Sequence, residues 1–125
     1  MRIVRATETR RTETPAAVMT TLASPTLGEA AQPVWKVEAA PGAPGPVHGI
    51  DADQVWSLIA GSVEVTVETE SATLTAGDTI IVPAGAERRF AAGPDGFTAL
   101  VTGPAGMHAF MPADPEKKID LAWAA

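Results

Sequence analysis

Hydrophobic and polar residues alternate through the middle of the chain in a pattern that predicts short β-strands. Residues 63–68 alternate valine with glutamate or threonine, which is the two-residue period of a strand with one buried and one solvent-facing side. The apolar segment 79–82 ends at Pro83, which stops a strand in a turn. Further strands are expected over residues 34–39, 54–60, 87–91 and 97–101. With turn signals such as PGAPGP and GPDG between them, these strands indicate an antiparallel barrel or sandwich.

The residues on either side of this middle region follow a different pattern. Residues 1–32 show no strong period, although IVRATETRRTET (3–14) can form an edge strand that pairs within the molecule or with a second copy. Near the other end, Asp114 is a typical helix N-cap and Pro115 a typical first helical residue. The expected organisation is therefore an N-terminal arm with edge strands over 1–32, a barrel over 33–111 and a helical tail over 112–125.

Composition narrows the class of protein. A chain of 125 residues with 46% hydrophobic residues can form one domain with an ordinary core. The lack of cysteine excludes disulfides, zinc–cysteine sites, iron–sulfur clusters and thiol nucleophiles. No apolar run approaches the ~20 residues of a membrane span, and the first residues lack the apolar stretch of a signal peptide. We expect a cytoplasmic protein that does not bind membranes.

Charge is distributed unevenly along the chain. The formal net charge of −6 argues against binding to a nucleic-acid phosphate backbone. Between residues 33 and 103 the only basic residues are Lys36, Arg88 and Arg89. An anion site in the barrel would therefore rely on very few positive groups, which draws attention to the arginine pair.

Two segments place glycines at characteristic distances from polar residues. The first, PGAPGPVHGIDADQVWSLIAG, has its key positions at Gly42, His48, Ile50, Gln54 and Gly61. The second, GDTIIVPAGAERRF, has them at Gly77, Pro83, Gly85 and Arg88. In spacing and order they resemble the two motifs of the cupin family, so the chain resembles a small single-domain RmlC-like cupin over roughly residues 33–103. The resemblance implies an all-β antiparallel barrel, also called a double-stranded β-helix or jelly roll, and frequent homodimers; the pattern near Asp114 adds a short C-terminal helix.

The resemblance also implies where a metal would bind. Cupins that hold a metal use two histidines and a glutamate from the first motif and a histidine from the second, a set suited to divalent metals. Those four positions read His48, Ile50, Gln54 and Arg88 here. An apolar side chain, a neutral amide and a permanent cation replace three of the four ligands, so no metal cofactor is expected. The alternative is a rebuilt site in which His48 recruits Asp51, Asp53 or His108.

In the implied barrel, one set of side chains faces the interior. Because alternate residues of a strand share a side, this set is His48, Ile50, Gln54, Trp56, Leu58, Arg88 and Phe90. The cavity that they outline has apolar walls and three polar groups converging on it, as small-molecule sites do. We expect the apolar members to contact the substrate and Arg89 to point away.

Three of these residues are candidate catalytic groups. His48 can act as a general acid or base, because its usual pKa lies near 6.5. Arg88 can pair with a substrate carboxylate or stabilise an enolate, and Gln54 can orient the substrate. Asp51 and Asp53 precede the Gln54 strand, where either can bind substrate, orient His48 or carry a second proton.

Each candidate also has a structural interpretation. His48 can be satisfied by a backbone carbonyl, Gln54 can fill space, and Trp56 and Phe90 can be ordinary core residues. A buried arginine must find a partner, and the candidates for Arg88 are Glu38, Asp53 and Glu87.

The function expected from these residues is proton transfer without a metal. The chain is interpreted as an enzyme that isomerises, cyclises or eliminates from a small, largely apolar carbonyl or carboxylate compound, with natural-product biosynthesis as a suggested setting. One alternative is a non-catalytic cupin that binds a small molecule, and another is a metal-dependent dioxygenase or isomerase with an unusual ligand set. The expected partners are a small-molecule ligand and a second copy of the chain, joined by strand pairing of the N-terminal arm.

Overall fold

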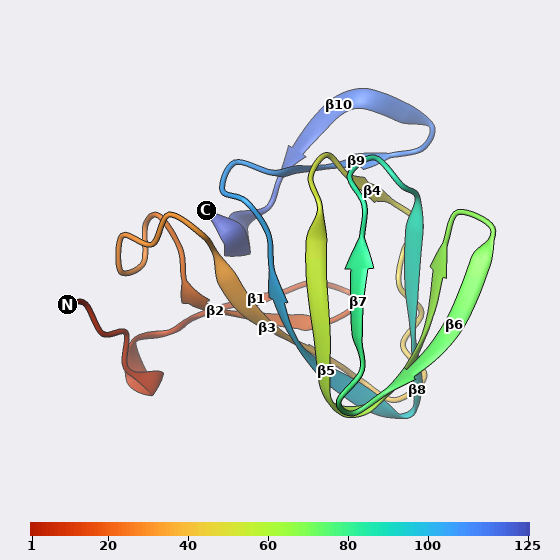
Figure 1. Ribbon diagram of the computed structural model, residues 1–125, viewed down its shortest axis with the longest axis horizontal. Helices are drawn as coiled ribbons and strands as arrows, with labels where there is room; N and C mark the ends of the chain where they lie inside the picture. Colours follow the sequence, from red (N-terminus) through yellow and green to blue (C-terminus); the bar gives the residue numbers. More distant parts are fainter.

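The computed structural model describes residues 1–125, and nearly all regular structure in it is β-strand (Figure 1). The strands are β1 (Arg10–Glu13), β2 (Val18–Ala23), β3 (Val34–Ala39), β4 (Gly49–Ile50), β5 (Gln54–Val67), β6 (Glu70–Thr75), β7 (Thr79–Val82), β8 (Arg88–Thr102), β9 (His108–Met111) and β10 (Asp114–Asp120). Two single turns of 3-10 helix complete the chain, η1 (Ala6–Glu8) and η2 (Ala122–Ala124). No helix is long and apolar enough to cross a membrane.

The strands form two antiparallel sheets. The seven-stranded sheet has the order β1-β2-β3-β8-β5-β6, with β7 also paired to β5. The three-stranded sheet has the order β10-β9-β4 and lies across one end of the long strands β5 and β8 (Figure 1). The predicted all-β antiparallel architecture is confirmed. The edge strand predicted in the N-terminal arm is β1, which pairs within the molecule with β2.

One predicted turn does not exist, and two predicted strand segments are joined, because β5 and β8 each run on as one long strand. The GPDG segment, expected to be a turn, lies inside β8. Gly61 of β5 and Gly96 of β8 both have positive φ, and a Cβ atom at Gly61 would collide with the carbonyl oxygen of Gly96. The register of the pair also shifts on either side of Gly61. The glycines therefore let the two strands bend together without ending.

The predicted C-terminal helix is wrong. Asp114 and Pro115 begin β10, which forms a hairpin with β9, and the only helical turn near this end is η2. Every residue of β10 is exposed, so no period-2 burial marks it as a strand. Proline is tolerated there because β10 is the edge of its sheet.

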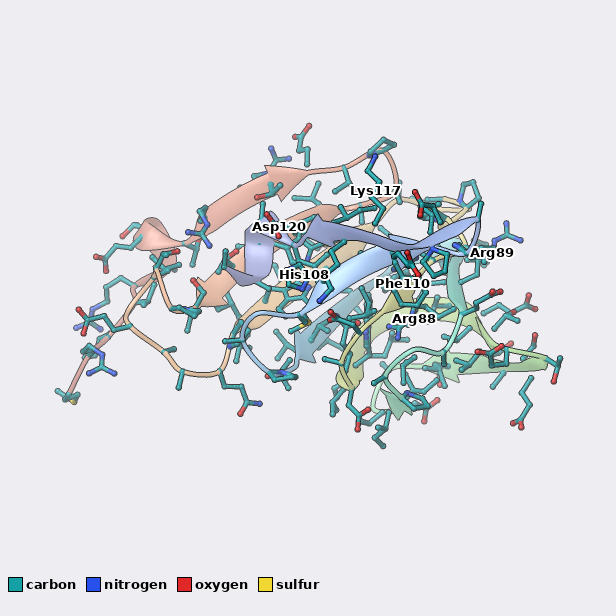
Figure 2. The ribbon with its side chains drawn as sticks, turned by 90° about the horizontal axis from the view of Figure 1, so that it is seen from above. Arg88, Arg89, His108, Phe110, Lys117 and Asp120 are labelled. Atoms are coloured by element: carbon teal, nitrogen blue, oxygen red, sulfur yellow. The ribbon has the colours of Figure 1, made fainter.

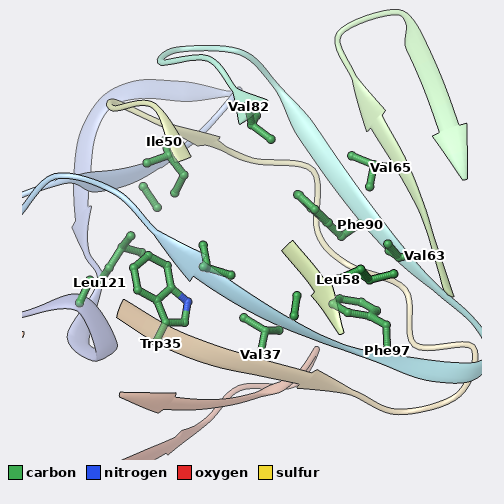
Figure 3. Packing of buried hydrophobic residues seen from close by; sticks show 14 of the residues in the cluster. Trp35, Val37, Ile50, Leu58, Val63, Val65, Val82, Phe90, Phe97 and Leu121 are labelled. Atoms are coloured by element: carbon green, nitrogen blue, oxygen red, sulfur yellow. The ribbon is translucent and has the colours of Figure 1, made fainter. Parts of the chain in front are cut away.

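The hydrophobic core lies between the two sheets and shows the predicted alternation (Figure 3). Trp35 and Val37 point inward from β3, as Val63 and Val65 do from β5. Leu121, from the segment after β10, packs into the same cluster. The C-terminal residues thus close one end of the interior, with the single 3-10 turn η2 in place of the predicted helix.

Candidate active site

A cavity of about 330 Å³ opens within the barrel, a size at the lower end of the range for small-molecule sites. Sixteen of the 22 residues that line it are hydrophobic. Its walls come from β2 and β3, from the β9–β10 hairpin and from the C-terminal segment, and include Met19, Trp35, Val37, Met111, Leu121 and Trp123. Of the predicted site residues, His48, Ile50, Gln54, Trp56 and Phe90 line the cavity.

His48 lines this cavity and keeps one ring nitrogen without a protein partner. Its Nδ1 lies 2.9 Å from the carbonyl oxygen of Pro46. Because a carbonyl oxygen can only accept, Nδ1 carries the hydrogen and Nε2 keeps its lone pair in the neutral ring. Burial lowers the pKa of His48 below 6.5, the hydrogen bond to Pro46 opposes this, and the positive charge of Arg88 lowers the pKa further. His48 is therefore a neutral base at neutral pH.

The backbone brings His48 and Arg88 together. The two residues exchange both backbone hydrogen bonds, His48 N–H to Arg88 O at 3.1 Å and Arg88 N–H to His48 O at 2.8 Å. Residues directly opposite in such a pair project to the same side of the sheet. The charge of Arg88 consequently adds to the effect of burial, which is the larger cause of the lowered pKa of His48.

Arg88 is a buried cation without a carboxylate partner. Its residue is 1% exposed, and its guanidinium donates to Gln54 Oε1 (3.1 Å), Ala86 O (3.3 Å) and Pro83 O (3.5 Å). Burial lowers its pKa to about 10, so it stays protonated at neutral pH. Arg88 does not line the cavity, so the expectation that it pairs directly with a substrate carboxylate does not fit the structure. Arg89 is exposed and points outward, as expected (Figure 2).

None of the three carboxylates considered as internal partners reaches Arg88. Glu38 pairs with Lys36 at 3.2 Å, and Asp53 Oδ1 accepts from the backbone N–H of Ala84 at 2.8 Å. Glu87 forms no ion pair within 4.0 Å. The buried charge is therefore surrounded by neutral oxygens only.

Gln54 connects Arg88 to the cavity. Its Oε1 accepts from Arg88 Nη1 and also from Trp56 Nε1, both at 3.1 Å, which fixes the orientation of the amide. Its Nε2 lies 3.2 Å from the sulfur of Met107. Trp56 in turn stacks on Phe90, with ring centroids 4.1 Å apart and planes at 24°. The donors of Arg88 and Trp56 that face Gln54 are thus already paired within the protein.

Three predicted contact residues lie outside the cavity. Leu58 packs in the hydrophobic core. The carboxylate of Asp53 accepts a hydrogen bond from the backbone N–H of Ala84 in the turn after β7. Asp51 binds His108, through Oδ1 to its backbone N–H (2.6 Å) and through Oδ2 to Nδ1 (3.3 Å). Neither aspartate orients His48. A loop position does not reveal which way a side chain points, and this is why the sequence left their direction open.

His108 belongs to a separate, more exposed cluster. Its Nε2 lies 3.4 Å from Asp120 Oδ1, so the ring sits between two carboxylates. Desolvation raises the pKa of Asp51, but the hydrogen bonds from His108, with the charges of His108 and Lys118, bring it below its usual value. Figure 2 shows His108 and Asp120 near each other on β9 and β10.

The cavity also has walls that sequence reasoning did not assign. Trp35 and Val37 were predictable, because they alternate in the expected strand 34–39. Leu121 and Trp123 were not, since they reach the cavity only through the path of the C-terminal segment. Hydrogen bonds hold this segment on β2; one of them runs from Thr21 Oγ1 to the carbonyl oxygen of Trp123 at 2.6 Å.

The residues at the four positions where the cupin resemblance implies metal ligands do not fit a divalent metal. Ile50 offers no lone pair, and the Arg88 guanidinium is positive and only donates. Gln54 Oε1 is already held by two N–H donors. His48 Nε2 is the one ligand atom left, and the possible recruits Asp51, Asp53 and His108 are engaged elsewhere. One imidazole is too few ligands for a protein metal centre.

Comparison with known proteins agrees with this fold. The family described as Cupin domain matches residues 35–102. An RmlC-like cupin from Shewanella frigidimarina is similar, with a TM-score of 0.71 and 24% identity over 83% of this chain and 91% of that one. KdgF from Halomonas sp. gives a TM-score of 0.67 and 22% identity, and the match covers 82% of this chain and 92% of that one. Oxalate decarboxylase from Bacillus subtilis at pH 4.6 gives a TM-score of 0.72 and 18% identity, and the match covers 80% of this chain and 28% of that one. No curated protein matches the sequence.

Proposed function

The chain belongs to the cupin family, and we propose that it is a metal-independent enzyme that transfers a proton on a small, largely apolar carbonyl compound. The observation that carries the proposal is the state of His48, a neutral imidazole whose free Nε2 belongs to a residue lining an apolar cavity. A positioned base with a pKa near or below neutrality is what proton abstraction at neutral pH requires. Identities below 25% to the solved structures support the fold and leave the reaction to these residues.

In the proposed step, His48 Nε2 removes a proton from the carbon next to the carbonyl group. The C–H bond breaks, its electron pair forms the enolate, and the imidazolium returns the proton to the same carbon or to another one. Return to another carbon isomerises the compound, and attack or departure of a group at the enolate stage would give cyclisation or elimination. The enzyme ends each cycle in its starting protonation state.

Arg88 acts from behind the cavity wall, and Gln54 acts as part of that wall. Burial lowers the pKa of His48 most, and the positive charge of Arg88 lowers it further, so both favour the neutral ring before the proton moves. Gln54 holds Arg88 and the Trp56 ring in place through a single oxygen. Both act through their positions, because Arg88 does not line the cavity and the oxygen of Gln54, which does line it, is engaged by two donors.

The test is hydrogen–deuterium exchange on an enolisable bicyclic ketone, 1-tetralone, followed by NMR in D₂O. The wild-type chain is expected to accelerate exchange at the carbon next to the carbonyl, and His48→Gln to lose about 10²–10⁴-fold of that acceleration, the usual contribution of an acid–base group. Equal rates for wild type and His48→Gln would contradict the proposal. The proposal would also be contradicted if the ketone bound saturably but exchanged its hydrogen for deuterium no faster than in buffer alone.

A second candidate function is binding without catalysis. It is favoured by the internal pairing of Gln54, Arg88 and the Trp56 N–H, which leaves few polar groups for a reaction. Saturable binding of ketones that are recovered unchanged and without deuterium would select this function over the first.

The homodimer expected from the sequence stays a prediction. Strand β1 ends the seven-stranded order, so its outer edge is open to another strand. Light scattering is expected to give twice the mass of the chain. A monomer at all accessible concentrations would show that this edge does not pair.

A further inference from the structure

We infer that the cavity is selective for neutral, ring-sized apolar molecules that carry one hydrogen-bond donor, and that it rejects carboxylates. The inference rests on the proposed function, because it names the ligand class of the same cavity. It narrows the sequence-based expectation, which allowed a carboxylate as readily as a carbonyl compound.

The cavity offers no positive charge to an anion. No lysine or arginine lines the cavity; the titratable lining residues are His48 and Asp120. Arg88 is separated from the cavity by Gln54, whose oxygen it already binds. A carboxylate entering the cavity would lose its hydration without gaining an ion pair, which is strongly unfavourable. The side chain of Asp120, 94% exposed, adds a negative charge at the rim.

The ring nitrogen of His48 that stays free is a hydrogen-bond acceptor. With its hydrogen held at Nδ1 by Pro46, His48 can only accept at Nε2. The amide oxygen of Gln54 is taken by Arg88 and Trp56. The matching group on a ligand is therefore a donor, either an O–H or N–H or the acidic C–H of an enolisable ketone. A ligand that offers only acceptors at this point leaves Nε2 unpaired.

The size and the lining of the cavity suit a planar ring system. A volume of about 330 Å³ suits one fused ring system. Aromatic and thioether side chains supply flat, polarisable surfaces around it, among them Trp35, Trp56, Phe90, Trp123, Met19 and Met111. Such surfaces pack well against a planar apolar ring.

The test uses three probes on one naphthalene frame and measures affinity by calorimetry on the full chain. 2-Naphthol carries a neutral donor, 2-methoxynaphthalene lacks the donor, and 2-naphthoate replaces it with a negative charge. The naphthol is expected to bind about fivefold to tenfold more tightly than the methoxy compound, the usual gain from one hydrogen bond. The naphthoate is expected to bind at least about tenfold more weakly than the naphthol, because its charge is desolvated without a partner.

His48→Leu serves as the matched variant. It should abolish the preference for naphthol over methoxynaphthalene, because it removes the acceptor that the naphthol O–H would bind. Circular dichroism and urea denaturation show separately that the variant folds. A naphthoate that binds more tightly than naphthol would overturn the inference, as would a naphthol preference that survives in His48→Leu. Failure of all three probes to bind would overturn the ring-size argument. If the naphthol preference holds but 1-tetralone does not exchange, the inference stands and the proposed catalysis fails.

Discussion

The two histidines of the chain lie in opposite electrostatic surroundings. His48 is half-buried, its Nδ1 is held by a neutral carbonyl, and the charged group that shifts its pKa is the cation of Arg88. His108 is on β9 between two carboxylates, Asp51 and Asp120, and its side chain is 30% exposed. Figure 2 shows Arg88 and the pair His108–Asp120 as separate groups.

The neighbours of an imidazole, more than the residue type, decide whether the ring is protonated and whether a ring nitrogen is free for a substrate. A ring beside a buried cation resists protonation and keeps a free lone pair for a substrate. A ring between two carboxylates already has partners on both nitrogens and serves to tie β9 to the β4–β5 loop and to β10. We therefore assign the chemistry to His48 and a structural role to His108.

The exchange rate should fall most when His48 is replaced and should not change when His108 is replaced. His48→Gln should lower the 1-tetralone exchange rate by about 10²–10⁴-fold. His108→Gln, the matched control, should leave the rate unchanged, because His108 does not line the cavity. If His108→Gln lost a comparable part of the rate while circular dichroism showed an intact fold, the assignment of a purely structural role to His108 would be wrong.

The next effect concerns stability at the buried cation. Gln54→Leu removes the acceptor of both Arg88 and Trp56, and two buried donors without partners should lower the free energy of unfolding by about 3 kcal/mol. Urea denaturation measures the change. Gln54→Glu is the control, since it keeps an oxygen at the same place. Equal stability of Gln54→Leu and wild type would show that water or another group satisfies these donors.

The pH dependence of exchange tests the influence of Arg88 on His48. Activity needs the neutral ring, so the rate should hold as the pH falls to 6.5 and decline only below it, because the pKa of His48 is lowered. Gln54→Glu places a negative charge against Arg88, which should raise the pKa of His48 and move this decline to higher pH. NMR titration of the His48 ring gives the same pKa independently. A decline that stays in place in Gln54→Glu would show that burial alone lowers the pKa.

The smallest effect is expected at the exposed cluster. Asp51→Asn keeps the hydrogen bond to the His108 backbone but removes the charge, so the loss of stability should be under about 1 kcal/mol at neutral pH. The folded-state pKa of Asp51 is lowered, so its contribution is present above pH 3.8 and disappears as the pH falls through the folded value. The unfolding curves of wild type and Asp51→Asn should therefore differ at neutral pH and coincide at acidic pH. A loss as large as that of Gln54→Leu would mean that the cluster is as critical as the buried site.

Much of the site was predictable because strands have a strict period. Once His48 and Ile50 were assigned to one strand and Gln54 and Trp56 to the next, their shared facing followed from alternation, and all four line the cavity. Leu58 follows the same alternation but lies too far along β5 to reach the cavity. The period predicts the side of a strand, and only the depth of the pocket decides which residues on that side touch a ligand.

By itself, the sequence determined the all-β class, the inward faces of the strands and the group of residues around His48, because these follow from local periodicity and motif spacing. Tertiary structure decided the partners. Residues 34 apart in the chain meet in the Arg88–Gln54 bond, and residues 102 apart meet in the Thr21–Trp123 bond that closes the cavity. It also turned Asp114 and Pro115 into a strand, since pairing with β9 outweighed a local helix signal. Such contacts depend on the paths of distant segments through space, which no local pattern specifies.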